Sequence, residues 1–271
     1  MATPAGPAPR QVSFIREGFH TVTPYLIVKR ASQFIEFTHR VFGAKERFRV
    51  QRPGTELISH AEIQIGDSVV ELADATEQFA PRSGALHVFV PHVDAVYQRA
   101  VKAGAASLYA PVDQPYGSRD SAVRDVFGHN WYIATYIASG PGKYVPEGLR
   151  TITPYLHPRS AAQFIDFVKR ALGGEEVMRH EAPEGSIRHA EVRIGDSVIE
   201  VSEARAEWPP MPMTLHLYVP DVDALYERAM TAGGVSIQAP ADQPYGDRSG
   251  GVRDPFGNQW FIATHIRDVQ P

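Results

Sequence analysis

Residues 123–135 read Val-Arg-Asp-Val-Phe-Gly-His-Asn-Trp-Tyr-Ile-Ala-Thr, and they are the most informative segment for the fold of this chain. It returns at residues 252–264 as Val-Arg-Asp-Pro-Phe-Gly-Asn-Gln-Trp-Phe-Ile-Ala-Thr. Each copy begins with the turn-forming residues Asp-x-Phe-Gly and continues with aromatic and β-branched residues, which favour a strand. The stretch therefore predicts a turn that leads into the last strand of a repeated unit.

The repeat extends over nearly the whole chain. Glu-Gly-Phe-His-Thr-Val-Thr-Pro-Tyr-Leu at residues 17–26 returns as Glu-Gly-Leu-Arg-Thr-Ile-Thr-Pro-Tyr-Leu at residues 147–156, an offset of 130. From His60 and His189 onward the offset is 129, which a one-residue deletion in a loop explains. We predict a disordered Pro/Ala-rich tail at 1–13, a first domain at 14–137, a Gly/Pro linker at 138–143 and a second domain at 144–268.

The hydrophobic periodicity within one copy separates its elements. Residues 21–28 have strand character, and residues 32–42 have apolar side chains at helical spacing that stop at Gly43. Three strands follow at 45–51, 59–65 and 68–73, separated by Pro-Gly and Gly-Asp turns. The order repeats with a strand at 85–90, a helix at 93–103 and three more strands. The chain is therefore predicted to be α+β, with four β-α-β-β-β modules.

The composition excludes several functional classes. A net charge of −4, from 27 basic and 31 acidic residues, gives no electrostatic basis for binding nucleic acid. We find no apolar run of transmembrane length and no signal peptide, so we expect a cytoplasmic protein without a membrane partner. The absence of cysteine excludes disulfides, thiolate metal sites and cysteine nucleophiles. No Gly-x-Ser-x-Gly elbow or phosphate-binding loop is present.

The modules and their motifs resemble the vicinal oxygen chelate superfamily, which includes glyoxalase I, bleomycin resistance proteins and extradiol dioxygenases, and within it the PhnB-like branch. The resemblance rests on Thr-Pro-Tyr-Leu, His-Ala-Glu-x-x-Ile-Gly-Asp-Ser-Val, Leu-His-x-x-Val and Asp-Gln-Pro-Tyr-Gly, each present in both copies. It implies that modules pair edge to edge into two curved, cup-shaped mixed sheets with the helices outside. We expect each copy to form its own cup, halves cut at the linker to fold, and the chain to be a monomer or a homodimer.

The resemblance also implies one metal-ligand position on each of four strands of a cup. In this chain those positions carry Thr23, Glu71, His87 and Tyr132 in the first copy, and Thr153, Glu200, His216 and Phe261 in the second. Only the glutamates and histidines are usual ligands. Glu71, His87, Glu200 and His216 are thus a possible but incomplete set for Zn, Ni, Mn or Fe, and both a metal-free cup and a metal completed by water or substrate stay open.

Strand alternation places further side chains on the cup face. Most are aromatic, which suggests a flat or apolar ligand held by stacking. His60 with Glu62, and His189 with Glu191, either face the cup or lie on a solvated sheet edge, and we favour the edge. Trp131 and Trp260 are predicted core residues. The predicted ligand-binding residues are Thr23, Tyr25, Phe89, Arg119, Tyr132, Thr153, Tyr155, Tyr218, Arg248 and Phe261, with the arginines as clamps for an anionic group at the rim.

Two functions remain open. In the first, the protein binds a small aromatic or amphipathic molecule in a cup, with no cofactor and no complete metal site. In the second, it is a metal-dependent enzyme of lyase, isomerase or dioxygenase type, in which the Glu/His pair of each cup holds part of the metal. Metal analysis of the purified protein distinguishes them.

Overall fold

The computed structural model describes residues 12–138, 140 and 142–269. Residues 1–11 of the predicted tail lie outside these ranges. The first copy contains β1 (Val22–Val28), α1 (Ala31–Phe42), β2 (Lys45–Gln51), β3 (Ile58–Ile65), β4 (Ser68–Asp74), β5 (Ala85–Phe89), α2 (Val93–Lys102), β6 (Ala106–Asp113), β7 (Ser118–Arg124) and β8 (Asn130–Tyr136).

The second copy repeats this order with one difference, because its first helix ends in a π-helical turn. Its elements are β9 (Ile152–Leu156), α3 (Ala161–Phe167), η1 (Val168–Leu172), β10 (Glu175–Glu181), β11 (Ile187–Ile194), β12 (Ser197–Val201), β13 (Thr214–Tyr218), α4 (Val222–Thr231), β14 (Val235–Asp242), β15 (Asp247–Arg253) and β16 (Gln259–His265). The α+β class and the four-module order are confirmed. No helix in the described part of the chain is long and apolar enough to cross a bilayer.

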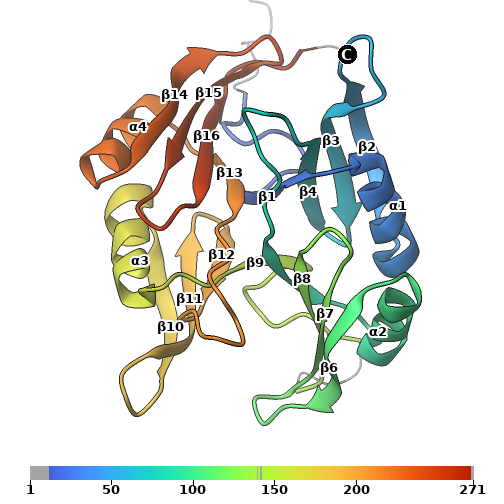
Figure 1. Cartoon of the computed structure of the whole chain (residues 1–271). Helices are drawn as coiled ribbons and strands as arrows, with labels where there is room; N and C mark the ends of the chain where they lie inside the picture. Colours follow the sequence, from blue (N-terminus) through green and yellow to red (C-terminus); the bar gives the residue numbers. More distant parts are fainter. Residues whose placement is uncertain (1–11, 139, 141, 270–271) are drawn as a thin grey trace, which may run out of the picture.

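The strands form two eight-stranded mixed sheets, and each sheet combines strands from both copies (Figure 1). The first, with the order β14-β15-β16-β13-β1-β4-β3-β2, pairs the first module with the fourth; we call its concave face cup 1. The second, β10-β11-β12-β9-β5-β8-β7-β6, pairs the second module with the third and forms cup 2. The expectation that each copy forms its own cup is therefore wrong. The division of the chain at 138–143 follows the sequence repeat and stays a prediction.

The two copies are held together at the strands where the sheets cross from one copy to the other. β1 runs antiparallel to β13, and β5 antiparallel to β9. The Gly-Asp-Ser turn of each copy docks on the first strand of the other: Thr151 N donates to Asp67 Oδ1 at 2.9 Å, and Thr21 N donates to Asp196 Oδ1 at 2.8 Å. At Gly66, φ is +60° and a Cβ would lie 2.3 Å from Thr151 Oγ1, so glycine is required for this approach.

The helices lie outside the sheets, and within one copy they pack on each other (Figure 1). α1 and α2 are joined by Arg99 Nε, which donates to Val41 O at 3.0 Å, and Phe34 of α1 stacks on Trp131 of β8 at 6.2 Å between ring centroids. Trp131 is fully buried, as is Trp260 in the second copy. The buried apolar residues on the helix side form one continuous cluster that includes both tryptophans and therefore spans both copies.

The repeated turn motif supports this core. The buried carboxylate of Asp125 accepts hydrogen bonds from the backbone N–H of Phe127 at 2.8 Å and of His129 at 2.9 Å, and from Trp131 Nε1 at 2.8 Å. Asp254 does the same for Trp260 at 3.0 Å. The aspartate fixes the turn and anchors the indole, so the prediction that these tryptophans are core residues is confirmed.

Candidate functional site in the cups

The Glu/His pairs form between copies. His216 Nδ1 of β13 lies 2.8 Å from Glu71 Oε2 of β4, and His87 Nδ1 of β5 lies 3.0 Å from both carboxylate oxygens of Glu200 on β12. The expected pairing of Glu71 with His87, and of Glu200 with His216, is wrong because β1 lies between β4 and β13, while β9 lies between β12 and β5. Each cup nevertheless contains one glutamate and one histidine.

The side chains of these pairs are largely buried, with the glutamates 2 to 3% exposed and the histidines 12 to 15% exposed. Burial alone would lower the pKa of His216 and of His87, but the attraction and hydrogen bond of the facing carboxylate outweigh it and raise both values. Burial alone would raise the pKa of Glu71, but the charge of His216 lowers it. In each cup the carboxylate therefore favours the charged form of the imidazole that faces it.

Cup 2 contains a cavity of about 810 Å³. Its walls include Phe89, Tyr109, Tyr132, Tyr155 and Trp208, and its polar lining includes His87, Asp120, Glu191 and Glu200. The exposed Arg188 and Arg205 also line it, and neither makes an ion pair with any residue that the structure describes. The cavity has the size and the mixed lining of a small-molecule site.

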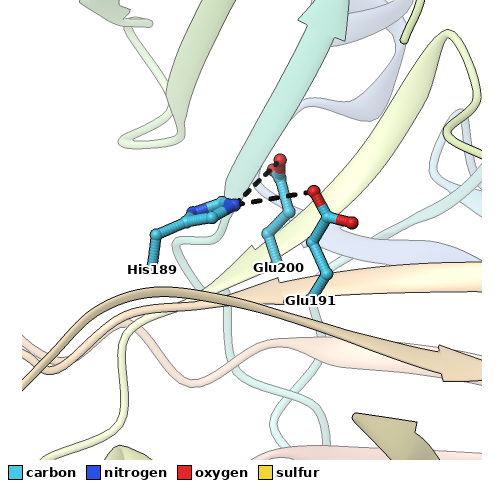
Figure 2. A group of neighbouring side chains, drawn as sticks. All are labelled: His189, Glu191 and Glu200. Carbon is cyan, nitrogen blue, oxygen red and sulfur yellow. Dashed lines mark ion pairs between the residues drawn. The ribbon is translucent and has the colours of Figure 1, made fainter. Parts of the chain in front are cut away.

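The second His/Glu pair of each copy faces the cup. His189 Nε2 lies 3.8 Å from Glu191 Oε1 and 4.0 Å from Glu200 Oε1, and Figure 2 shows the imidazole directed at both carboxylates. Tyr155 OH is 3.2 Å from His189 Nδ1. In cup 1, His60 Nε2 lies 3.3 Å from Glu62 Oε1. The preferred interpretation of these pairs as a solvated sheet edge is wrong, because Glu62 is buried and because His189 and Glu191 line the cavity of cup 2.

Of the four positions that the family resemblance implied for a metal in each cup, only the glutamate and the histidine carry usual ligand groups. In cup 2 they carry Thr153 and Tyr132 besides Glu200 and His87, and these last two already bond each other. In cup 1 the fourth position is Phe261, which has no donor atom. A different set does suit a cation: His189, Glu191 and Glu200 can offer ligand atoms that all lie within 4.8 Å of one another.

The predicted aromatic residues divide between the cups. Tyr132 and Tyr155 are 5.1 Å apart between ring centroids in cup 2, and Tyr25 and Phe261 are 5.9 Å apart in cup 1, where they line a cavity of about 540 Å³. Tyr218 is buried in cup 1 and donates to Asp247 Oδ2 at 2.9 Å. Phe89 stacks on His87, while Thr23 and Thr153 are buried beside His216 and His87 in the strand register.

The two predicted arginine clamps lie elsewhere. The guanidinium of Arg119 bonds both oxygens of Asp94, at the start of α2, at 2.7 and 2.8 Å, and Arg248 does the same with Asp223 on α4. Neither arginine lines the cavity of cup 2 or the cavity of cup 1. This placement does not support the predicted clamp, because the fork of each arginine already holds a helix to a hairpin.

Several cavity residues of cup 2 escaped the sequence analysis because they differ between the copies. His157, Asp120 and Tyr109 correspond to Ile27, Ser249 and Gln238, so the repeat does not mark them as shared site residues. His157 Nε2 lies 3.1 Å from Tyr132 OH, and burial lowers the pKa of His157 to about 4, so it is neutral at physiological pH. Burial raises the pKa of Asp120. Polar residues that occur in one copy and are replaced in the other were therefore the sequence signal for this site.

The chain is similar to known proteins both in sequence and in structure. Uncharacterized proteins of Mycobacterium bovis and of Mycobacterium tuberculosis strain H37Rv are each 36% identical over 129 residues, which is 44% of this chain and 85% and 76% of those proteins. Each of these relatives is therefore matched along most of its length by about one copy. Glyoxalase I from Zea mays has a TM-score of 0.68 at 15% identity over 89% of this chain and 92% of that one, and a putative dioxygenase from Bacillus subtilis has 0.57 at 14% over 91% and 85%.

These structural likenesses show the fold alone. The family is shown by its sequence model, which matches the chain twice, over residues 18–133 and 156–262, in agreement with the duplication. The chain belongs to the Glyoxalase/Bleomycin resistance protein/Dioxygenase superfamily.

Proposed function

We propose that cup 2 binds a small aromatic or amphipathic molecule, and that the protein is of the PhnB-like type. The observation that supports the binding proposal is the cavity of about 810 Å³, which is lined by aromatic side chains and by acidic and histidine side chains. Aromatic rings offer a flat apolar ligand a large contact area, and the few polar groups fix its orientation. The aromatic lining in cup 1 borders a smaller cavity of about 540 Å³.

Binding is tested with 2-naphthol, a neutral amphipathic bicyclic aromatic molecule. The chain has three tryptophans, and since Trp131 and Trp260 are fully buried, Trp208 is the one that reports on the cavity. We expect saturable quenching of Trp208 fluorescence, and a Tyr155→Ala variant that binds about 5 to 10 times more weakly because a stacking partner is lost.

The matched control is Tyr25→Ala, which removes the corresponding tyrosine of cup 1 and should leave this affinity unchanged. Trp208→Phe should remove the fluorescence signal while calorimetry still detects binding. Equal losses in Tyr155→Ala and Tyr25→Ala, or no saturation up to the solubility limit of 2-naphthol, would contradict the proposal.

A second candidate function is favoured by the cluster in Figure 2. We infer that His189, Glu191 and Glu200 can hold a divalent cation, because one imidazole and two carboxylates are ligands that zinc, manganese and iron accept. Such an ion would supply Lewis acidity toward an oxygen of a ligand in the cavity. The chain's own residues would then orient the ligand and exclude water.

Metal titration separates this candidate from the first. If it is right, one equivalent of Zn²⁺, Ni²⁺, Mn²⁺ or Fe²⁺ binds per chain and raises the unfolding temperature, and binding is lost in His189→Ala but kept in the cup 1 control His60→Ala. Less than about a tenth of an equivalent bound, with no thermal shift for any of the four ions, would remove this candidate.

A further inference from the structure

The polar end of cup 1 is filled by the chain itself. Residues 14–19, which we call the arm, run into this cup before β1: Phe14 O accepts from His265 N at 3.0 Å, and Phe19 packs edge-on against Tyr218 at 5.8 Å between centroids. The guanidinium of Arg16 forms an ion pair with Glu62 and lies 4.2 Å from the centroid of the Phe19 ring. The arm therefore brings a planar cation, backed by an aromatic ring, to a buried carboxylate.

Cup 2 has the same carboxylate without this cation. Glu191 occupies on β11 the place that Glu62 has on β3, opposite Glu200 and Glu71 respectively. The side chain of Glu62 is 3% exposed under Arg16, whereas that of Glu191 is 22% exposed and borders the cavity. Within the described residues, no arginine or lysine forms an ion pair with Glu191, and its neighbour is the imidazole of His189, with Nε2 3.8 Å from Oε1.

The sequence explains the difference by one residue of the arm. Glu-Gly at residues 17–18 returns at 147–148, so the residue that corresponds to Arg16 is Pro146. Pro146 lines the cavity of cup 2 with Leu149, the counterpart of Phe19. Proline carries neither a charge nor an N–H donor. The position in cup 2 that corresponds to the Arg16 guanidinium of cup 1 is therefore part of the open cavity.

A second acid in cup 2, Asp120, has one carboxylate oxygen without a hydrogen-bond donor among the described residues. Asp120 of β7 is 4% exposed and lines the same cavity. Its Oδ2 accepts from Tyr116 OH, but among the described residues no group donates to its Oδ1. Buried oxygens of this kind are normally hydrogen-bonded. Cup 1 carries Ser249 at the corresponding position, so this requirement belongs to cup 2 alone.

We propose that the ligand of cup 2 is a planar organic cation, a guanidinium or amidinium on an aromatic body, whose charged group takes beside Glu191 the place that Arg16 takes beside Glu62. This inference rests on the proposed small-molecule function of cup 2. A guanidinium has several N–H donors in one plane and can serve Glu191 and a second acceptor together. The aromatic body then lies against Tyr132, Tyr155 and Trp208.

An organic cation accounts for more of the site than a metal ion does. The cavity of about 810 Å³ is far larger than one ion at His189, Glu191 and Glu200 needs, and its aromatic walls offer a metal ion no ligand. The cation that actually stands at the equivalent place in the same protein is a guanidinium. Arg188 and Arg205 at the exposed part of the cavity can accept a polar or anionic group at the other end of the ligand.

The experiment compares phenylguanidinium with phenylurea, a neutral molecule of nearly the same shape, in buffer containing EDTA. With Trp208 fluorescence and calorimetry, we expect phenylguanidinium to bind at least about tenfold more tightly, since charge-assisted hydrogen bonds replace neutral ones. Glu191→Gln should remove this preference, and Pro146→Arg should abolish binding by supplying the cation from the chain. Glu62→Gln in cup 1 is the matched control and should leave the preference unchanged.

A second part of the experiment uses cup 1. Arg16→Ala empties the place beside Glu62, and we expect phenylguanidinium, but not phenylurea, to bind to a second site and to restore the unfolding temperature. Equal affinity for the two probes in the unmodified chain would overturn the inference while leaving aromatic binding intact. Binding of neither probe would overturn it as well, and the 2-naphthol titration then decides the proposed function separately. Zn²⁺ binding that needs Glu191, without phenylguanidinium binding, would replace the organic cation by a metal.

Discussion

A polypeptide of residues 12–138 alone is expected to be a dimer, and to lose its folded state on dilution. In the full chain the outer edge of β1 pairs with β13 and that of β5 pairs with β9, so the isolated first copy has both edges open. The unpaired backbone N–H and C=O groups of an open strand edge form hydrogen bonds with another strand when one is available. β13 repeats Leu-His-x-x-Val of β5, and β9 repeats Thr-Pro-Tyr-Leu of β1, so two identical copies can form both pairings.

Light scattering with size exclusion should therefore give twice the mass of the fragment, and its unfolding temperature should rise with concentration. The same measurement on the full chain is the control, because its edges are already paired and this source of concentration dependence is absent. In the dimer each cup would combine Glu71 with His87. A monomeric fragment as stable as the full chain would contradict the pairing between copies.

Asp125→Ala is expected to destabilise the protein by about 3 to 5 kcal/mol, since a buried carboxylate that accepts three hydrogen bonds is removed and its donors are left unpaired. For a chain of this size the unfolding temperature should fall by on the order of 10 °C. Thermal and urea unfolding measure the change.

Asp254→Ala should behave alike, because Asp254 holds the corresponding turn and Trp260. Asp125→Asn, which keeps one acceptor oxygen, should cost less than the alanine variant. Because Asp125 bonds its own turn and Trp131 on the core side, a folded variant should bind ligands in cup 2 as the unmodified protein does. A loss below about 1 kcal/mol would show that the motif is not the anchor we describe.

Much of the fold was predictable because local patterns act over short distances. The helix that ends at Gly43 and the strand of residues 130–136 follow from side-chain periodicity and from turn residues. The inward direction of Glu71 and His87 followed from strand alternation. The direction of His189 and Glu191 did not, because alternation gives two faces and only the curvature of the whole sheet shows which face is enclosed.

The site was less predictable because the two cups are lined by different residues at several corresponding positions. Tyr132 and Tyr155 were found, but His157 and Asp120 occur in one copy and were missed. Arg16 was also missed, because it precedes the repeated strands and reaches Glu62 only through the path of the arm. Contacts between residues 46 positions apart are set by tertiary packing, which no local pattern reports.

The duplication, the four modules, the repeated turn motif and the aromatic lining of a cup follow from the sequence alone. Which modules share a sheet, and therefore that Glu71 lies beside His216 and Glu200 beside His87, depends on the tertiary structure. The physical reason is that strands pair through their backbones. β1 and β9 have nearly the same sequence, so the strand sequences do not determine which of the two pairs with β5. The pairing of β5 with β9 is set by how the connected chain packs as a whole.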